Sequence, residues 1–136
     1  MELTAVKVDV QDTLDVPVTF DDEGTPIEGF EVVGPDSHQY QDADRKWRLR
    51  SVKRAASRGR PVDSRSENGA AEVLNTTLAV QREIVFACVV GMYGFTDNGV
   101  PAEVNVKTLD VIFTARPSWL TKVYMAIEAN VGFTPV

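Results

Sequence analysis

The chain has 136 residues, of which 43% are hydrophobic and 25% are charged, and its formal net charge is −6 at pH 7. This length and apolar content fit one domain with a buried core. The negative balance disfavours a general nucleic-acid-binding protein, because long-range attraction to phosphate requires a positive surface field.

The charge is divided unevenly along the chain. Residues 1–44 carry −11, residues 45–60 carry +8, and the remainder carries −3. Such asymmetry indicates interaction with another macromolecule. The cations of the basic segment are Arg45, Lys46, Arg48, Arg50, Lys53, Arg54, Arg58 and Arg60.

Residues 1–34 predict a β segment. Apolar and polar side chains alternate over 14–20, which is typical of a strand with one buried face. Pro17 removes a hydrogen-bond donor from this run and favours an edge strand. A second strand is expected over 27–33, and the alternation over 4–10 could supply a third. Together they predict an antiparallel hairpin or small sheet.

A basic helix is expected over 36–59. Asp36 is placed to cap its start, with Gln39 reaching back as in a capping box. Gly59 is placed to end it. Its apolar edge is narrow, so most of its surface should remain polar and free. The residues of that edge are Tyr40, Ala43 and Trp47.

Residues 61–69 are polar and predict a flexible link, and 70–130 predict a helical core followed by a tail at 131–136. The first core helix is expected to continue to Gly91. Two shorter helices should follow, with Asn105 capping one and Pro117 in the first turn of the other. The predicted core residues share helical spacing. They are Leu74, Leu78, Val85, Val89, Phe113, Trp119, Val123 and Ile127.

These elements predict a single α+β domain over 1–136: an N-terminal β-hairpin or small antiparallel sheet followed by a bundle of about four α-helices. The residues offer little for catalysis. His38 is the single histidine, and Cys88 lies in an apolar run typical of a buried, inert thiol;. No metal-ligand spacing, phosphate loop, signal peptide or membrane span is found. We therefore expect neither an enzyme nor a cofactor.

Three interpretations of the basic segment remain open. It is a solvated helix face, a docking surface for an acidic or amphipathic protein, or, less favoured, a nucleic-acid-binding surface. For a protein partner, the candidate contact residues combine exposed cations with the aromatic edge of the helix. They are Tyr40, Arg45, Trp47, Arg48 and Lys53.

Four short motifs occur in a recognisable order. They are GPDSHQYQDADRKW at 34–47, ACVVGMYGF at 87–95, ARPSWL at 115–120 and NVGF at 130–133. In this arrangement the chain resembles the tail assembly chaperones of long-tailed bacteriophages. It departs from their pattern at Met92-Tyr93, where a tryptophan is common, and at 61–69, which lacks the usual charged helical run.

The resemblance implies a non-enzymatic chaperone. Such proteins bind the tape measure protein, keep it soluble and help to recruit tail tube subunits. They act in the host cytoplasm and are absent from the mature virion. Self-association is left open, and no membrane partner is implied. The alternatives are a structural virion protein, such as a minor tail or connector component, and a nucleic-acid-binding protein.

Overall fold

The computed structural model describes residues 13–58 and 67–130. The chain forms an α+β fold with a three-stranded antiparallel sheet and four helices, which confirms the predicted fold class. The expected strand at 4–10, most of the link and the tail at 131–136 lie outside the described residues. The elements are β1 (Thr13–Phe20), β2 (Pro26–Val33), α1 (His38–Arg58), α2 (Glu67–Cys88), β3 (Val89–Tyr93), β4 (Thr96–Asp97), β5 (Val100–Pro101), α3 (Val106–Ala115) and α4 (Pro117–Ala129).

The sheet has the strand order β1-β2-β3, so β1 is an edge strand within the described residues. Its pairing with β2 shifts register between Pro17 and Thr19. Proline and an irregular register both suit an edge, since neither supports a full hydrogen-bond ladder. The edge position predicted from Pro17 is therefore confirmed.

The helix expected to continue to Gly91 ends earlier. α2 stops at Cys88, and Val89 begins β3, where it pairs with Val32 of β2. Two consecutive β-branched valines, Val89 and Val90, followed by Gly91 favour an extended backbone over a helix. The region 70–130 is therefore not wholly helical, and it supplies the third strand of the sheet.

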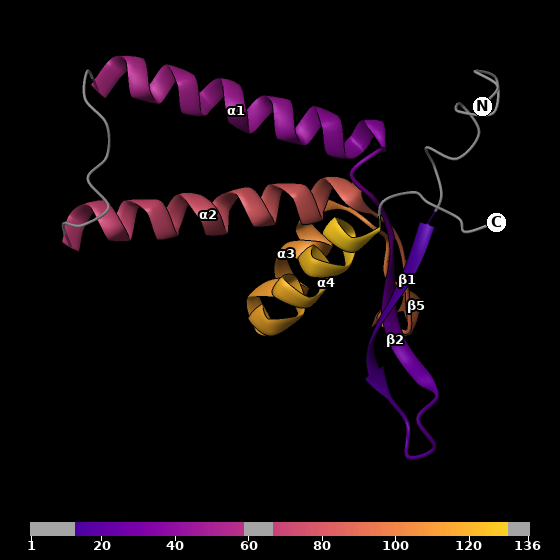
Figure 1. Cartoon of the computed structure of the whole chain (residues 1–136). Helices are drawn as coiled ribbons and strands as arrows, with labels where there is room; N and C mark the ends of the chain where they lie inside the picture. Colours follow the sequence, from indigo (N-terminus) through magenta and orange to yellow (C-terminus); the bar gives the residue numbers. More distant parts are fainter. Residues whose placement is uncertain (1–12, 59–66, 131–136) are drawn as a thin grey trace, which may run out of the picture.

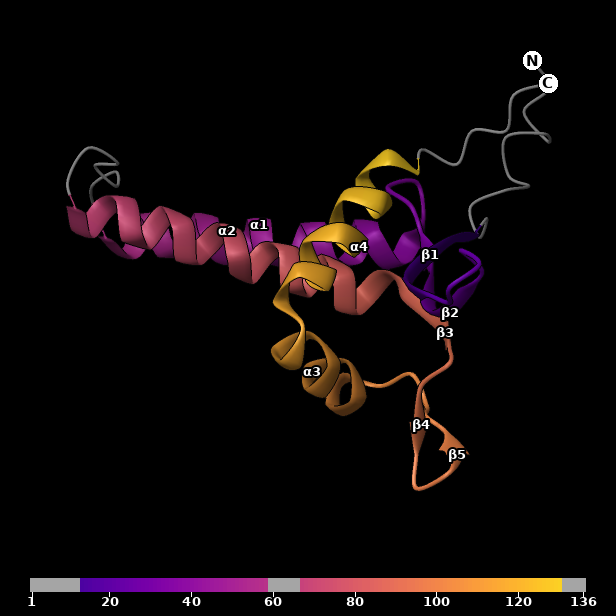
Figure 2. The ribbon, with the colours of Figure 1, turned by 90° about the horizontal axis from the view of Figure 1, so that it is seen from below.

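α1 and α2 run side by side as a long antiparallel pair that extends away from the sheet (Figures 1 and 2). α4 packs against β1, β2 and α2, and α3 contacts α4. Both short helices lie along the half of α2 nearest the sheet (Figure 1). We call residues 45–58 and 67–81 the distal hairpin, and the sheet, α3, α4 and the remaining parts of α1 and α2 the body.

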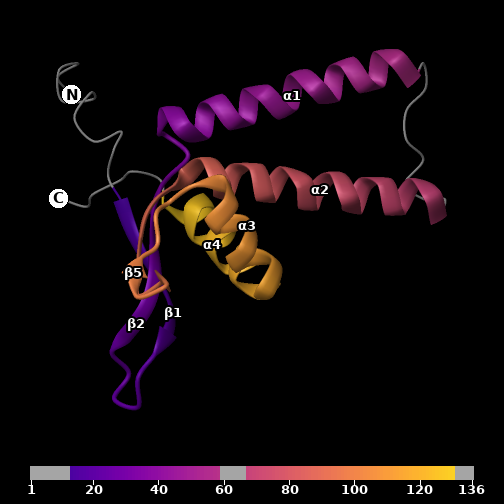
Figure 3. The ribbon, with the colours of Figure 1, turned by 180° about the vertical axis from the view of Figure 1, so that it is seen from behind.

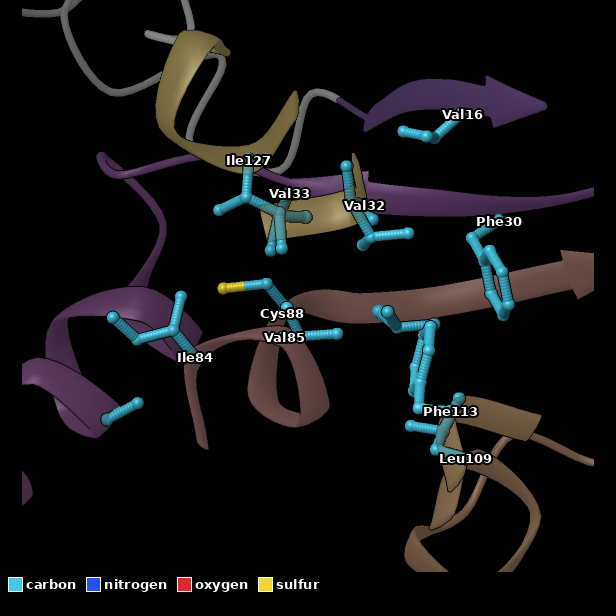
Figure 4. Packing of buried hydrophobic residues seen from close by; sticks show 13 residues of the cluster. Val16, Phe30, Val32, Val33, Ile84, Val85, Cys88, Leu109, Phe113 and Ile127 are labelled. Carbon is cyan, nitrogen blue, oxygen red and sulfur yellow. The ribbon is translucent and has the colours of Figure 1, made fainter. Parts of the chain in front are cut away.

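The core lies entirely in the body. Phe30 of β2 is at its centre, with its ring centroid 5.2 Å from both Phe95 and Phe113. Figure 4 shows buried apolar side chains from the sheet, α2, α3 and α4, among them Phe30 and Phe113. The buried apolar residues are Val16, Phe30, Val32, Val33, Ala43, Ile84, Val85, Cys88, Val89, Leu109, Phe113, Val123 and Ile127.

Two predicted core residues are not in the core. Leu74 is 58% exposed and Leu78 is 48% exposed, so this part of the prediction was wrong. They share the helical stripe of Val85, but α2 has 22 residues and α4 has only 13. The stripe therefore extends beyond the helices that cover it. Trp119 is half-buried, whereas the remaining predictions are confirmed as buried: Val85, Val89, Phe113, Val123 and Ile127.

The first turn of α1 is capped by Ser37, not by the predicted Asp36. The Ser37 hydroxyl accepts the backbone N–H of Tyr40 at 3.2 Å and donates to the carbonyl of Gly34 at 2.7 Å. Ser37 is buried, so its hydroxyl satisfies groups that water does not reach. The starts of the last two helices are as predicted: the Asn105 side chain accepts the backbone N–H of Thr108, and Pro117 lies in the first turn of α4.

Candidate functional site

The side of α1 that faces away from α2 combines cations with large apolar side chains. Leu49 is 56% exposed and Val52 is 68% exposed. On a helix, residues three or four positions apart are neighbours, so the cations surround this apolar pair. We call this surface the outer face of α1. Its members are Arg45, Arg48, Leu49, Val52 and Lys53.

The cations of the outer face are well exposed. Arg45 pairs with Asp42 and Arg48 pairs with Asp44, each at 3.0 Å along the same helix. Such exposed pairs contribute little to stability and exchange easily for other partners. Lys53 has no ion pair among the described residues. Because no acidic residue occurs from 45 to 60, the distal part of α1 presents a positive surface.

The two aromatic residues of the predicted contact set face the other way. The Tyr40 hydroxyl donates to Glu128 of α4 at 2.6 Å. Burial and then this hydrogen bond raise the pKa of Tyr40, which therefore stays neutral;. Trp47 is half-buried, and its indole N–H donates to Asp44 at 3.2 Å. The fold thus groups Arg45, Arg48 and Lys53 on one face and sets Tyr40 and Trp47 apart from them.

Between α1 and α2 lies a cleft of about 490 Å³. Trp47 lines it together with mostly small and polar side chains, among them Ser51, Ala71 and Asn75. The polar side-chain contacts across this cleft come from two arginines of α1. Arg50 pairs with Glu83, and the Arg54 guanidinium donates to the Thr76 hydroxyl at 3.4 Å. The helices of the distal hairpin are therefore not joined by a shared apolar interface.

Most large aliphatic side chains of the distal hairpin are exposed, although Val80 is half-buried and lines the cleft. Val73, Leu74 and Leu78 of α2 are exposed, as are Leu49 and Val52 of α1. Exposed large apolar side chains on a projecting element are candidates for a protein interaction surface. We missed the α2 part of this surface, although the excess length of its apolar stripe was visible in the sequence.

Beyond this surface, the described residues include one buried thiol and a second hollow. No group of three or more His, Cys, Asp or Glu residues in the described ranges is placed to hold a metal. Cys88 is fully buried, and burial raises the pKa of its thiol to about 12. A second hollow of about 620 Å³ lies between β4–β5 and α3, and its lining includes Val100, Val111 and Ile112. None of the described helices is apolar over enough of its length to cross a bilayer.

Comparison with known proteins finds no relative of this chain. No protein-family model matches the chain, and no curated protein or solved structure matches it.

Proposed function

We propose that this protein is a non-enzymatic assembly chaperone that holds a helical, partly acidic protein on its distal hairpin. The sequence motifs make it a candidate phage tail assembly chaperone, with the tape measure protein as its principal partner and tail tube subunits as further partners. It would act in the host cytoplasm and leave before the virion is complete.

The observation that carries this proposal is the exposure of most large aliphatic side chains on the distal hairpin. Leu49 and Val52 lie among cations on α1, and Leu74 and Leu78 lie on a neutral stripe of α2. An amphipathic helix docks through apolar side chains spaced along one face. Arginine and lysine stems cover apolar partner surface, while their charged ends attract acidic residues. This chemistry suits an acidic amphipathic helix.

The same geometry disfavours a nucleic acid as the partner. Trp47 faces α2 and bonds to Asp44, so it is not presented as a platform on which a base could stack. A duplex-binding or single-strand-binding function would have to act against the chain's net charge of −6;.

The test is co-expression with the tape measure protein of the same phage, followed by a solubility and pull-down assay. Replacing Arg45, Arg48 and Lys53 with Glu should reduce co-purification strongly. The variant should melt near the wild type, because exposed charges contribute little to stability.

The matched control makes the same change in net charge elsewhere. Lys107, Arg116 and Lys122 are exposed and lie at or near α3 and α4. Their replacement with Glu should leave co-purification near wild type. Undiminished capture by the outer-face variant would contradict the proposal, and so would equal loss in both variants. Mass spectrometry of purified particles separates a chaperone, which is absent, from a structural virion protein, which is present.

A further inference from the structure

A third hollow lies between α1 and α2, at the place where the distal hairpin joins the body. It has a volume of about 550 Å³, and Val106 at the start of α3 forms part of its wall. Figure 3 shows α1 and α2 side by side, with α3 beginning near the end of α2 that adjoins the sheet. Arg50 and Glu83 line both this hollow and the cleft of the distal hairpin, so their ion pair lies at the boundary between the two. We call the third hollow the proximal groove.

Apolar side chains from all three helices line the proximal groove. Ala43 of α1 is buried, Phe86 and Ala87 of α2 are half-buried, and Val106 is 69% exposed. The two alanines are short, so they leave space between α1 and α2 that a larger side chain can fill. An apolar side chain seated there would also cover Val106 and remove its surface from water.

Two cations on facing helices accompany these apolar residues. Lys46 of α1 is exposed and forms no ion pair with any described residue. Arg82 of α2 lies over the Phe86 ring, with its guanidinium carbon 4.5 Å from the ring centroid, and it pairs with Asp110 of α3. These two contacts hold the guanidinium in place. A guanidinium carries more N–H donors than one carboxylate uses, so Arg82 can bind a second anion.

The carboxylates around the proximal groove are already paired. Asp42 pairs with Arg45 at 3.0 Å, and Glu83 pairs with Arg50. Together with the ion pair between α2 and α3, these contacts give each carboxylate an arginine. Lys46 is the cation left without a counter-ion among the described residues. The ligand that complements this arrangement carries a negative charge beside an apolar group.

We propose that the proximal groove binds a peptide segment of a partner protein in which a glutamate or aspartate neighbours a large apolar residue. The carboxylate binds Lys46 from α1 and Arg82 from α2, through charge-assisted hydrogen bonds. The apolar side chain packs against Ala43, Ala87 and Val106. One uncompensated cation offers little to a run of phosphates, which disfavours a nucleic acid as the ligand.

This site is separate from the outer face of α1. The outer face is formed by residues of α1 alone, whereas the proximal groove needs α1, α2 and α3 together. The inference therefore goes beyond the proposed function and does not rest on it. A chain with both surfaces can hold two acidic segments at once.

Fluorescence anisotropy of a labelled probe peptide tests this proposal. The probe is a short peptide of alternating glutamate and leucine, and its control carries glutamine in place of each glutamate. The probe should bind at least about tenfold more tightly than its control, because glutamine cannot form the charge-assisted hydrogen bonds. Lys46→Glu should weaken probe binding at least about tenfold for the same reason, and Val106→Asp should weaken it as well. Both variants should melt near the wild type, since both residues are exposed;.

Lys53→Glu is the matched control. It makes the same change in charge on the same helix, about two helical turns farther from the body, and it should leave probe binding near wild type. Absence of binding to the wild-type chain would overturn the proposal. Equal weakening by Lys46→Glu and Lys53→Glu would also overturn it, because the probe would then lie on the outer face. A single-stranded DNA oligonucleotide that binds more tightly than the probe would contradict the assignment to a peptide.

Discussion

The apolar stripe of α2 is buried in the body and exposed in the distal hairpin. Val85 is fully buried, whereas Leu78, seven residues earlier on the same side of the helix, is 48% exposed. Seven residues are two helical turns, so the two side chains point in nearly the same direction. The difference lies in their surroundings, because Val85 lies within the buried core and Leu78 lies on the part of α2 that extends beyond it. Helical periodicity thus identifies a face that needs a partner, but not where that partner comes from.

The polar contacts differ between the two regions as well. In the body, a buried serine caps α1 and tyrosine joins α1 to α4 through a carboxylate. In the distal hairpin, α1 and α2 flank an open cleft that two arginines of α1 bridge with polar contacts. The body is therefore expected to determine stability, and the distal hairpin to determine binding.

The strongest test of this division is a matched pair of aspartates on the stripe. Val85→Asp buries an unpaired charge in the core, which costs several kcal/mol and should unfold a marginally stable domain. Leu78→Asp leaves its charge in water and should melt within a few degrees of the wild type. Circular dichroism melts check both. Similar melting temperatures for the two variants would contradict the division into a stabilising body and an exposed distal hairpin.

The centre of the core gives the next largest effect. Phe30→Ala removes a ring that packs on both Phe95 and Phe113. We expect a loss of about 3–5 kcal/mol in the free energy of unfolding, the usual range for a buried phenylalanine. Urea denaturation measures it. A loss below about 1 kcal/mol would mean that the sheet and α3 do not share one core.

Cys88 offers a measurement that needs no mutation. The thiolate is the reactive form, and burial raises the pKa of this thiol to about 12;. At about pH 8 a thiol reagent should label the native chain at least about a hundredfold more slowly than the urea-unfolded chain. Equal rates would place Cys88 at the surface and contradict the position of β3 next to it.

The cap of α1 gives a smaller effect. Ser37→Ala removes the acceptor for the Tyr40 N–H and should lower the free energy of unfolding by about 1 kcal/mol. Asp36→Ala, one residue earlier, should have less effect than this if Ser37 is the capping residue. The reverse order, measured by urea denaturation, would restore the capping box expected from the sequence.

The smallest effect is expected on the outer face of α1. Arg48→Ala removes an exposed pair with Asp44 and should change the free energy of unfolding by less than about 1 kcal/mol. A larger loss would mean that Arg48 stabilises the fold, and it would weaken the proposal that the outer face serves binding.

Local pattern was enough to predict much of the fold. Alternation located β1 and β2, Pro17 marked the edge, and Asn105 and Pro117 marked the starts of α3 and α4. The sequence did not show that the helix ends before Val89. Val89 joins the sheet by pairing with β2, and that pairing joins residues far apart in the sequence. It also did not show that Leu74 and Leu78 are exposed, since that depends on the length of α4.

The candidate site divides in the same way. The cations at Arg45, Arg48 and Lys53 were visible as a charge run, and their exposure follows from the narrow apolar edge of α1. Tyr40 and Trp47 were predicted as contact residues because they are aromatic within that run. Their place beside α4 and α2 depends on tertiary packing, which a single helix does not reveal.

The central claim is that the distal hairpin binds the partner while the body holds the fold. Hydrogen–deuterium exchange of the free chain and of its proposed complex with the tape measure protein tests it most directly. We predict slower exchange on binding in residues 45–57 and 70–81, with little change in the buried residues of β2 and α4. Protection confined to the sheet, α3 and α4, with no change in the distal hairpin, would contradict the account.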